Sequence, residues 1–273
     1  MKGIYFCSKL EEVNPFHEKG IYDGTWVQLV ISERSEYAMM TRKTLLFQFT
    51  VSTFYAGWQL RAMDFISYQA GYGRNIIVTA SPERYAEAQE IYRGHSKEEA
   101  FLRSYEPRFL VHSAPPGAVP YILRDGALRS WNRVKSAGQC LEDAPIGALL
   151  GDPEDFRDYI MLGEGLAPEV VVSSKEKGKI CMDPDCSYTP GVRFYFDTTR
   201  LLSEGLLVRD GCHYKVKEEL PLHLAVYTAS MQTLQLQDRQ VTPRIFTQEA
   251  DQAFACYLQA YQLLKKREGN KPL

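Results

Sequence analysis

The chain has 273 residues, of which 45% are hydrophobic and 24% charged, a balance typical of globular rather than disordered proteins. Its formal net charge of −2 excludes an overall basic surface for nucleic acid, although a local basic groove can exist on such a chain. The 6 scattered cysteines indicate reduced thiols, and the early acidic residues argue against a signal peptide. We therefore expect a soluble, cytoplasmic protein of one large or two smaller domains.

Composition divides the chain into two blocks. Residues 1–105 are rich in aromatic side chains and are predicted to form an N-terminal α/β module of unknown role. Residues 106–273 are predicted to form a second domain. The uncharged stretch from Thr44 to Leu60 is shorter than the roughly 20 apolar residues that a spanning helix needs, so we predict a buried core segment.

The first block ends in a predicted strand and helix. Residues 75–80 form a short β-branched run that is typical of a strand. Ser81, Pro82 and Glu83 supply an N-cap, a proline at the first helical position and an early acid, so a helix should follow. A further short strand is predicted at 108–111, ending at His112, with a helix after it that Gly126 caps.

The second block continues with mixed elements. The run 170–172 suggests a strand, 192–197 gives the strongest strand signal, and a short helix should follow that strand. Two more strands are predicted at 212–217 and 223–228. A long C-terminal helix, capped by Thr247 and ended by Gly269, should carry one apolar stripe for core or partner contact.

Common catalytic motifs are absent from the sequence. It contains no GxxxxGK[ST], HExxH or GxSxG motif. Cys181 and Cys186 are spaced CxxxxC without a second cysteine or histidine pair at metal spacing, so no metal is expected.

The order of three segments nevertheless carries a resemblance. VHSAPPGAVPYILRDGAL is followed by DFRDYIML and then by DGCHYKVKEELPL. Over about residues 108–230 this order resembles the ADP-ribosyltransferase superfamily, in particular DarT-type nucleic-acid ADP-ribosyltransferase toxins and RNA 2′-phosphotransferases. The resemblance implies an α+β fold with a split β-sheet core and flanking helices. It also implies NAD as substrate and a role in toxicity or phage defence, with RNA or DNA as acceptor and an antitoxin-like protein as a possible partner.

The same resemblance implies roles for individual residues. His112 and Ser113 would hold the ribose and nicotinamide end of NAD. Either Arg133 or Arg129 would bind the diphosphate, where a guanidinium matches phosphate geometry. Either Tyr159 or Tyr195 would pack on the nicotinamide ring.

The catalytic position departs from the family pattern. Alignment places His213 where DarT-type enzymes have a glutamate, whereas Glu218 and Glu219 fall later in the chain. Either His213 serves as the polar orienter or base, or one of the two glutamates does.

Three alternatives to nucleic-acid ADP-ribosylation remain open. RNA 2′-phosphotransfer also consumes NAD, but the chain lacks the HxH pair of those enzymes. Transfer to a protein side chain is not separable from the leading hypothesis by sequence. A non-catalytic binding protein with the same fold is favoured by the missing glutamate.

Overall fold

The computed structural model describes residues 3–41, 45–95, 101–139 and 144–269. It is a mixed α+β structure, as predicted, and its contacts divide it into two compact units. Unit 1 comprises Met1–Arg108, Arg129–Met161 and Thr198–Glu219, and unit 2 comprises Phe109–Leu128, Leu162–Asp197 and Leu220–Leu273. The expected modules 1–105 and 106–273 are consecutive, whereas the two compact units are interleaved along the chain.

Unit 1 begins with a five-stranded sheet in the order β1-β5-β2-β4-β3. The first four strands in that order are parallel and β3 is antiparallel to β4. Their bounds are β1 Ile4–Phe6, β2 Trp26–Ser32, β3 Ala38–Thr41, β4 Phe47–Ser52 and β5 Asn75–Thr79. Every residue of β4 is buried, as expected for the core segment predicted between 44 and 60, whereas Leu45, Phe54 and Tyr55 of that stretch are exposed.

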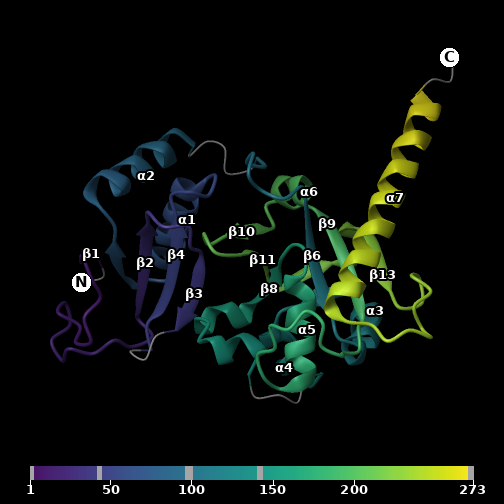
Figure 1. Cartoon of the computed structure of the whole chain (residues 1–273), viewed down its shortest axis with the longest axis horizontal. Coiled ribbons are helices and arrows are strands. Elements are labelled where there is room, and N and C mark those ends of the chain that lie inside the picture. Colours follow the sequence, from purple (N-terminus) through teal and green to yellow (C-terminus); the bar gives the residue numbers. More distant parts are fainter. Residues whose placement is uncertain (1–2, 42–44, 96–100, 140–143, 270–273) are drawn as a thin grey trace. The chain divides into compact units, whose positions relative to one another are not determined.

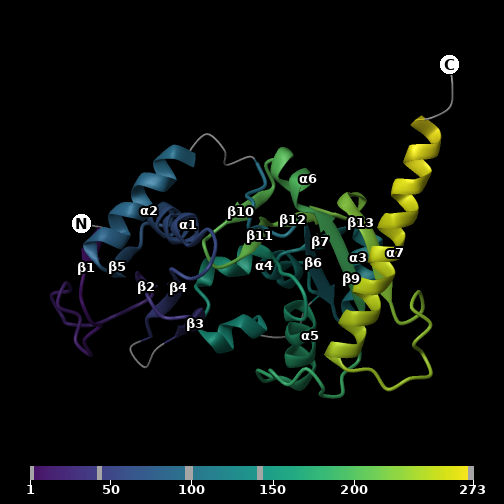
Figure 2. The same ribbon diagram turned by 45° about the horizontal axis from the view of Figure 1, so that its top comes forward.

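Helices α1 (Trp58–Gly71) and α2 (Pro82–His95) pack on one face of this sheet (Figures 1 and 2). Alternation along β5 explains the layering: Ile76 and Val78 join the core beneath the helices, whereas Ile77 packs on the other face with Trp26. The strand predicted at 75–80 and the helix predicted after Ser81 are both confirmed.

The later segments of unit 1 add a three-stranded sheet in the order β10-β11-β8. Strands β10 (Leu207–Arg209) and β11 (Tyr214–Lys217) form an antiparallel hairpin, and β8 spans Tyr159–Leu162. Short helices accompany them, namely α4 Trp131–Ser136, η2 Ile146–Leu150, η3 Glu154–Asp158 and α6 Thr198–Ser203. Gly211, in the hairpin turn, has φ +84° and lies so close to α1 that an added Cβ would meet the Arg61 carbonyl oxygen at 2.2 Å.

Unit 2 is built on the antiparallel sheet β13-β9-β6. Its strands are β6 Phe109–Ala114, β9 Val192–Asp197 and β13 Ala225–Ser230, and Figure 1 shows helix α7 (Pro243–Gly269) beside them. The remaining elements are η1 Pro116–Ala118, α3 Val119–Asp125, α5 Ala167–Lys177 and η4 Leu222–Leu224, while β7 (Ala127–Arg129) and β12 (Glu219–Pro221) form a two-stranded sheet. Gly126 ends α3 in the left-handed region, as predicted.

Several predicted elements differ in the structure, including the strands expected at 212–217 and 223–228, which lie at Tyr214–Lys217 and Ala225–Ser230. Strand β6 does not end at His112 but continues to Ala114. The strand expected at 170–172 is wrong, because these valines lie within α5, where Pro168 stands at the first turn. Helix α7 begins at Pro243, four residues before the expected cap Thr247. Among the described helices, none has the length and apolar character needed to cross a membrane.

Candidate functional site

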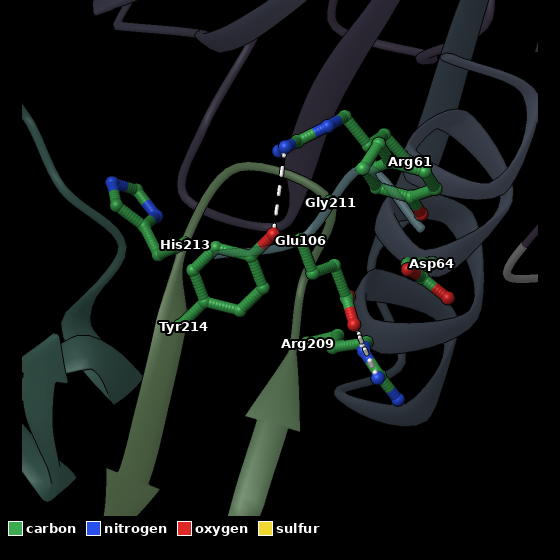
Figure 3. A pocket seen from close by; sticks show the side chains of 8 residues that line it. Arg61, Asp64, Glu106, Arg209, Gly211, His213 and Tyr214 are labelled. Carbon is green, nitrogen blue, oxygen red and sulfur yellow. Dashed lines mark hydrogen bonds and ion pairs between the residues drawn. The ribbon is translucent and has the colours of Figure 1, made fainter. Parts of the chain in front are cut away.

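A charged pocket in unit 1 lies between helix α1 and the β10–β11 hairpin (Figure 3). Both carboxylates of its lining, Asp64 and Glu106, form ion pairs. Arg209 makes two hydrogen bonds to Glu106, at 2.6 and 2.7 Å, and Arg103 makes two to Asp64. Each carboxylate of the lining is therefore neutralised by its own guanidinium.

Arg61 is the exception among these arginines. Its Nη2 lies 3.4 Å from the Tyr214 hydroxyl, and its guanidinium carbon lies 5.2 Å from the ring centre of Tyr105 and 6.0 Å from that of Tyr214. Within the described part of the chain, no carboxylate forms an ion pair with it. Arg61 thus contributes a half-buried positive charge at the pocket wall that has no ion-pair partner among the described residues.

The β10–β11 hairpin and its turn carry a buried lysine–carboxylate pair. Lys215 and Asp210 are both 0% exposed, and the ammonium donates to Asp210 Oδ2 at 2.5 Å. The ammonium also lies 3.8, 3.7 and 4.7 Å from the ring centres of Tyr68, Phe156 and Tyr159, a cation–π cage. Burial lowers the pKa of Lys215, whereas the charges of His213 and Lys215 outweigh the burial of Asp210 and hold its pKa below the usual value.

His213 belongs to this cluster and, of the three predicted catalytic residues, is the one whose side chain lies beside a buried carboxylate. Its Nδ1 lies 3.4 Å from Asp210 Oδ2, and its backbone N–H donates to Asp210 Oδ1 at 2.6 Å. The carboxylate can therefore orient the ring and leave Nε2 as the basic nitrogen. The imidazole is part-exposed, as a base that meets a substrate must be.

The same turn holds one potential metal-ligand set among the described residues. Asp210, Cys212 and His213 each offer a ligand atom within 4.8 Å of the others. The donor set fits a cation poorly, because the Lys215 ammonium already occupies the Asp210 carboxylate and would repel added positive charge. Burial also raises the pKa of the Cys212 thiol, which disfavours the thiolate that a metal requires.

Asp152 gives a test of this electrostatic environment. Burial raises its pKa to about 6 from 3.8, so the folded chain holds this proton more tightly than the unfolded chain. Stability should therefore fall as the pH rises from about 4 to about 6, and Asp152→Asn should raise the free energy of unfolding at pH 7 by about 1–3 kcal/mol. Urea unfolding across this range should give a flatter pH profile for the variant. The exposed Asp238→Asn control should follow the wild type, and a wild-type profile for Asp152→Asn would contradict the assignment.

The arginines and glutamates predicted for the site pair with one another. Arg129 Nε lies 3.3 Å from Glu219, and Arg133 lies 3.5 Å from both Glu218 and Glu219. Glu218 adopts a left-handed φ of 60°. Its backbone N–H donates to the Asp158 carbonyl, and its carbonyl accepts from the Ser130 N–H. A diphosphate bound by these arginines would have to compete with the glutamates.

The two predicted aromatic partners of nicotinamide are both buried. Tyr159 in unit 1 donates to, or accepts from, the Tyr72 hydroxyl at 2.8 Å, and its ring contributes to the cage around Lys215. Tyr195 in unit 2 stacks on Phe254 with ring centres 4.3 Å apart. Both rings thus have packing partners within their own units.

His112 and Ser113 lie on opposite faces of the β6–β9 sheet. Register pairs His112 with Phe194 and Ser113 with Arg193, so the half-buried histidine shares its face with Phe194. Ser113 instead donates to Glu169. Of the nine predicted site residues, His112, Ser113 and Tyr195 belong to unit 2 and the other six to unit 1.

Ser113 and Tyr195 join a buried polar network around Arg193, which is 0% exposed. Its guanidinium reaches Glu169 at 3.3 Å, the Gly165 carbonyl at 2.8 Å and Asp251 at 3.1 Å, and Nε donates to the Tyr195 hydroxyl at 2.9 Å. Tyr188 also donates to Glu169 at 2.8 Å. The network connects the sheet to α5 and α7. Ser113 and Tyr195 therefore have a structural role in this network that does not depend on a ligand.

Sequence reasoning missed Arg61, Asp210 and Lys215. For Asp210 a signal was available, because an Asp-Gly pair before a strand is typical of a hairpin turn. For Arg61 and Lys215, the neighbouring sequence contains no feature that distinguishes them from charged residues on a solvated surface. Comparison of the chain with protein-family models, curated proteins and solved structures finds no match.

Proposed function

We propose that this chain is an NAD-dependent ADP-ribosyltransferase that modifies a nucleic acid as a toxin or phage-defence effector. The observation that carries the proposal is the order of elements from His112 onward. The histidine stands on β6, α3 and its Gly126 cap follow, and the later strands are distributed over two separate three-stranded sheets, β10-β11-β8 and β13-β9-β6. The order of strand, helix and cap supports the sequence resemblance, while the strands that follow are shared between the two units.

The chemistry assigns a proton-transfer role to His213. In transfer of ADP-ribose, an acceptor nucleophile bonds to C1′ of the ribose while the bond to nicotinamide breaks, and the bonding electrons leave with the nicotinamide nitrogen. The nucleophile must lose a proton in the process. We assign that role to His213, because Asp210 can orient its ring, whereas Glu218 and Glu219 are engaged with arginines.

The decisive test is release of nicotinamide from NAD by the purified chain with RNA, DNA or cell lysate. We expect His112→Ala to reduce the rate roughly 100-fold, as for loss of one positioning hydrogen-bond donor. The exposed His223→Ala on η4 is the matched control and should retain the wild-type rate. Mass analysis of the nucleic acid and of the protein then shows whether ADP-ribose has been transferred to the nucleic acid or to a protein side chain.

Two outcomes would overturn the proposal. One is a wild-type chain that releases no nicotinamide with any of these acceptors and binds NAD no more tightly than His112→Ala. The other is a folded His112→Ala variant as active as the wild type. The first outcome would favour a non-catalytic binding protein.

A further inference from the structure

The pocket beside Arg61 has features of an anion site, a role distinct from the proton transfer assigned to His213 in the same lining. Glu106 pairs with Arg209, and Asp64 pairs with Arg103 of the adjoining cavity, so Arg61 gives this group of five charged side chains one excess positive charge. Its guanidinium is held by the Tyr214 hydroxyl and two tyrosine rings rather than by an acid. Such a preorganised, planar donor matches the oxygens of a phosphate.

The size of the pocket limits what can enter it. Its cavity of about 10 Å³ has room for one water-sized group, such as a single phosphate oxygen. A second cavity of about 190 Å³ shares Asp64 and Arg209 with it and is also lined by Ser67, Tyr92 and Leu207. That volume lies below the roughly 300–1,000 Å³ of sites that enclose whole small molecules, so it suits one unit of a longer ligand.

The lining of the second cavity indicates the kind of unit. Tyr68 and Tyr92 provide aromatic surface, and Arg103 and Arg209 provide guanidinium groups. Aromatic rings beside arginines are the usual means by which proteins hold a base and its phosphate in single-stranded nucleic acid. The adjoining cavities therefore combine a place for a phosphate oxygen with a place for the attached nucleoside.

We propose that Arg61 and the two adjoining cavities of unit 1 bind one nucleotide of a single-stranded nucleic acid, with Arg61 on its phosphate. This inference rests on the proposed function, because it assigns the acceptor-binding role to the N-terminal part of the chain. The hairpin turn at Gly211 lies against α1 and thereby places Tyr214 beside Arg61.

The experiment measures binding of a short fluorescent RNA or DNA oligonucleotide to the full chain without NAD. Arg61→Gln is expected to weaken binding roughly tenfold and to reduce the slope of log affinity against log salt by about 1. Arg61→Lys keeps the charge but loses the planar fork of donors, so its affinity for the oligonucleotide should lie between that of the wild type and that of Arg61→Gln. Arg84→Gln, on the exposed surface of α2, is the control for loss of one positive charge.

A second variant protects the test against misfolding of the half-buried Arg61 variants. Ser67 is exposed and lines the larger cavity, so Ser67→Glu adds a negative charge without disturbing the core. It should weaken binding by a similar factor, whereas Gln237→Glu, an equal charge change in unit 2, should not.

Unchanged affinity in both Arg61→Gln and Ser67→Glu would overturn the inference. Competition by inorganic phosphate or a mononucleotide as potent as that by the oligonucleotide would also overturn it, since the site would then hold a free anion. Failure of the proposed function is separate, because it appears as absent nicotinamide release from the wild-type chain whether or not the oligonucleotide binds.

Discussion

Replacing Arg193 with methionine is expected to lower the free energy of unfolding by about 3–5 kcal/mol. The guanidinium is completely buried and joins Glu169, Asp251, Tyr195 and the Gly165 carbonyl. Methionine fills much of the volume but leaves Glu169, only 1% exposed, as a buried carboxylate without its counter-charge. Urea unfolding followed by near-ultraviolet circular dichroism measures the loss.

Two comparisons make the Arg193 result specific. Arg244→Met removes an exposed pair with Asp185 in the same unit and should cost less than about 1 kcal/mol. Adding Glu169→Gln to Arg193→Met should recover part of the loss, since the neutral amide oxygen can accept from one of the Ser113 and Tyr188 hydroxyls while its NH2 group donates to the other. A cost for Arg193→Met no greater than that of Arg244→Met would contradict the network.

Lys215→Met should produce the second large effect, again a loss of about 3–5 kcal/mol. It removes the ammonium from a fully buried Asp210, which keeps only the backbone donors of Cys212 at 2.9 Å and His213 at 2.6 Å besides the histidine ring. It also removes the cation from the cage of Tyr68, Phe156 and Tyr159.

A double-mutant cycle with Asp210→Asn measures the coupling within this pair. The double variant should be less destabilised than the sum of the two single variants, because each single variant leaves a lone buried charge and the double variant leaves none. Acid sensitivity gives an independent check. Because the pKa of Asp210 lies below its unfolded value, its stabilisation is present above about pH 4 and is lost as the pH falls further. Additive losses in the cycle would show that the two groups are not coupled.

The sequence predicted correctly those helices, strands and caps whose formation depends on neighbouring residues in the chain. The strand at 75–80, the helix after Ser81 and the Gly126 cap all depend on neighbouring residues and are confirmed. The run 170–172 was misassigned because three β-branched residues favour a strand, whereas Pro168 and packing of α5 against β6 and α7 decide for a helix.

The candidate site could be predicted only in part. The sequence drew attention to His213 and to the strand holding His112, since an ordered set of motifs carries that information. It could not show that Arg129 and Arg133 pair with Glu218 and Glu219, or that Arg61 lacks an acidic partner among the described residues. The two pairs with Glu219 join residues 86 and 90 positions apart, and Glu106 and Arg209 are 103 positions apart. Such pairs depend on tertiary packing that no local signal encodes.

The interleaving of the two units has a consequence for synthesis of the chain. The sheet and helices of residues 1–108 are made first, yet Cys212 belongs to their core and Phe156 and Val208 pack with Tyr68. At ribosomal rates the segment ending at Glu219 emerges on the order of 10 s after Arg108. Throughout that interval the nascent chain displays unfinished apolar surface, so we expect it to be a client of ribosome-associated chaperones and to aggregate when translation stalls before Glu219.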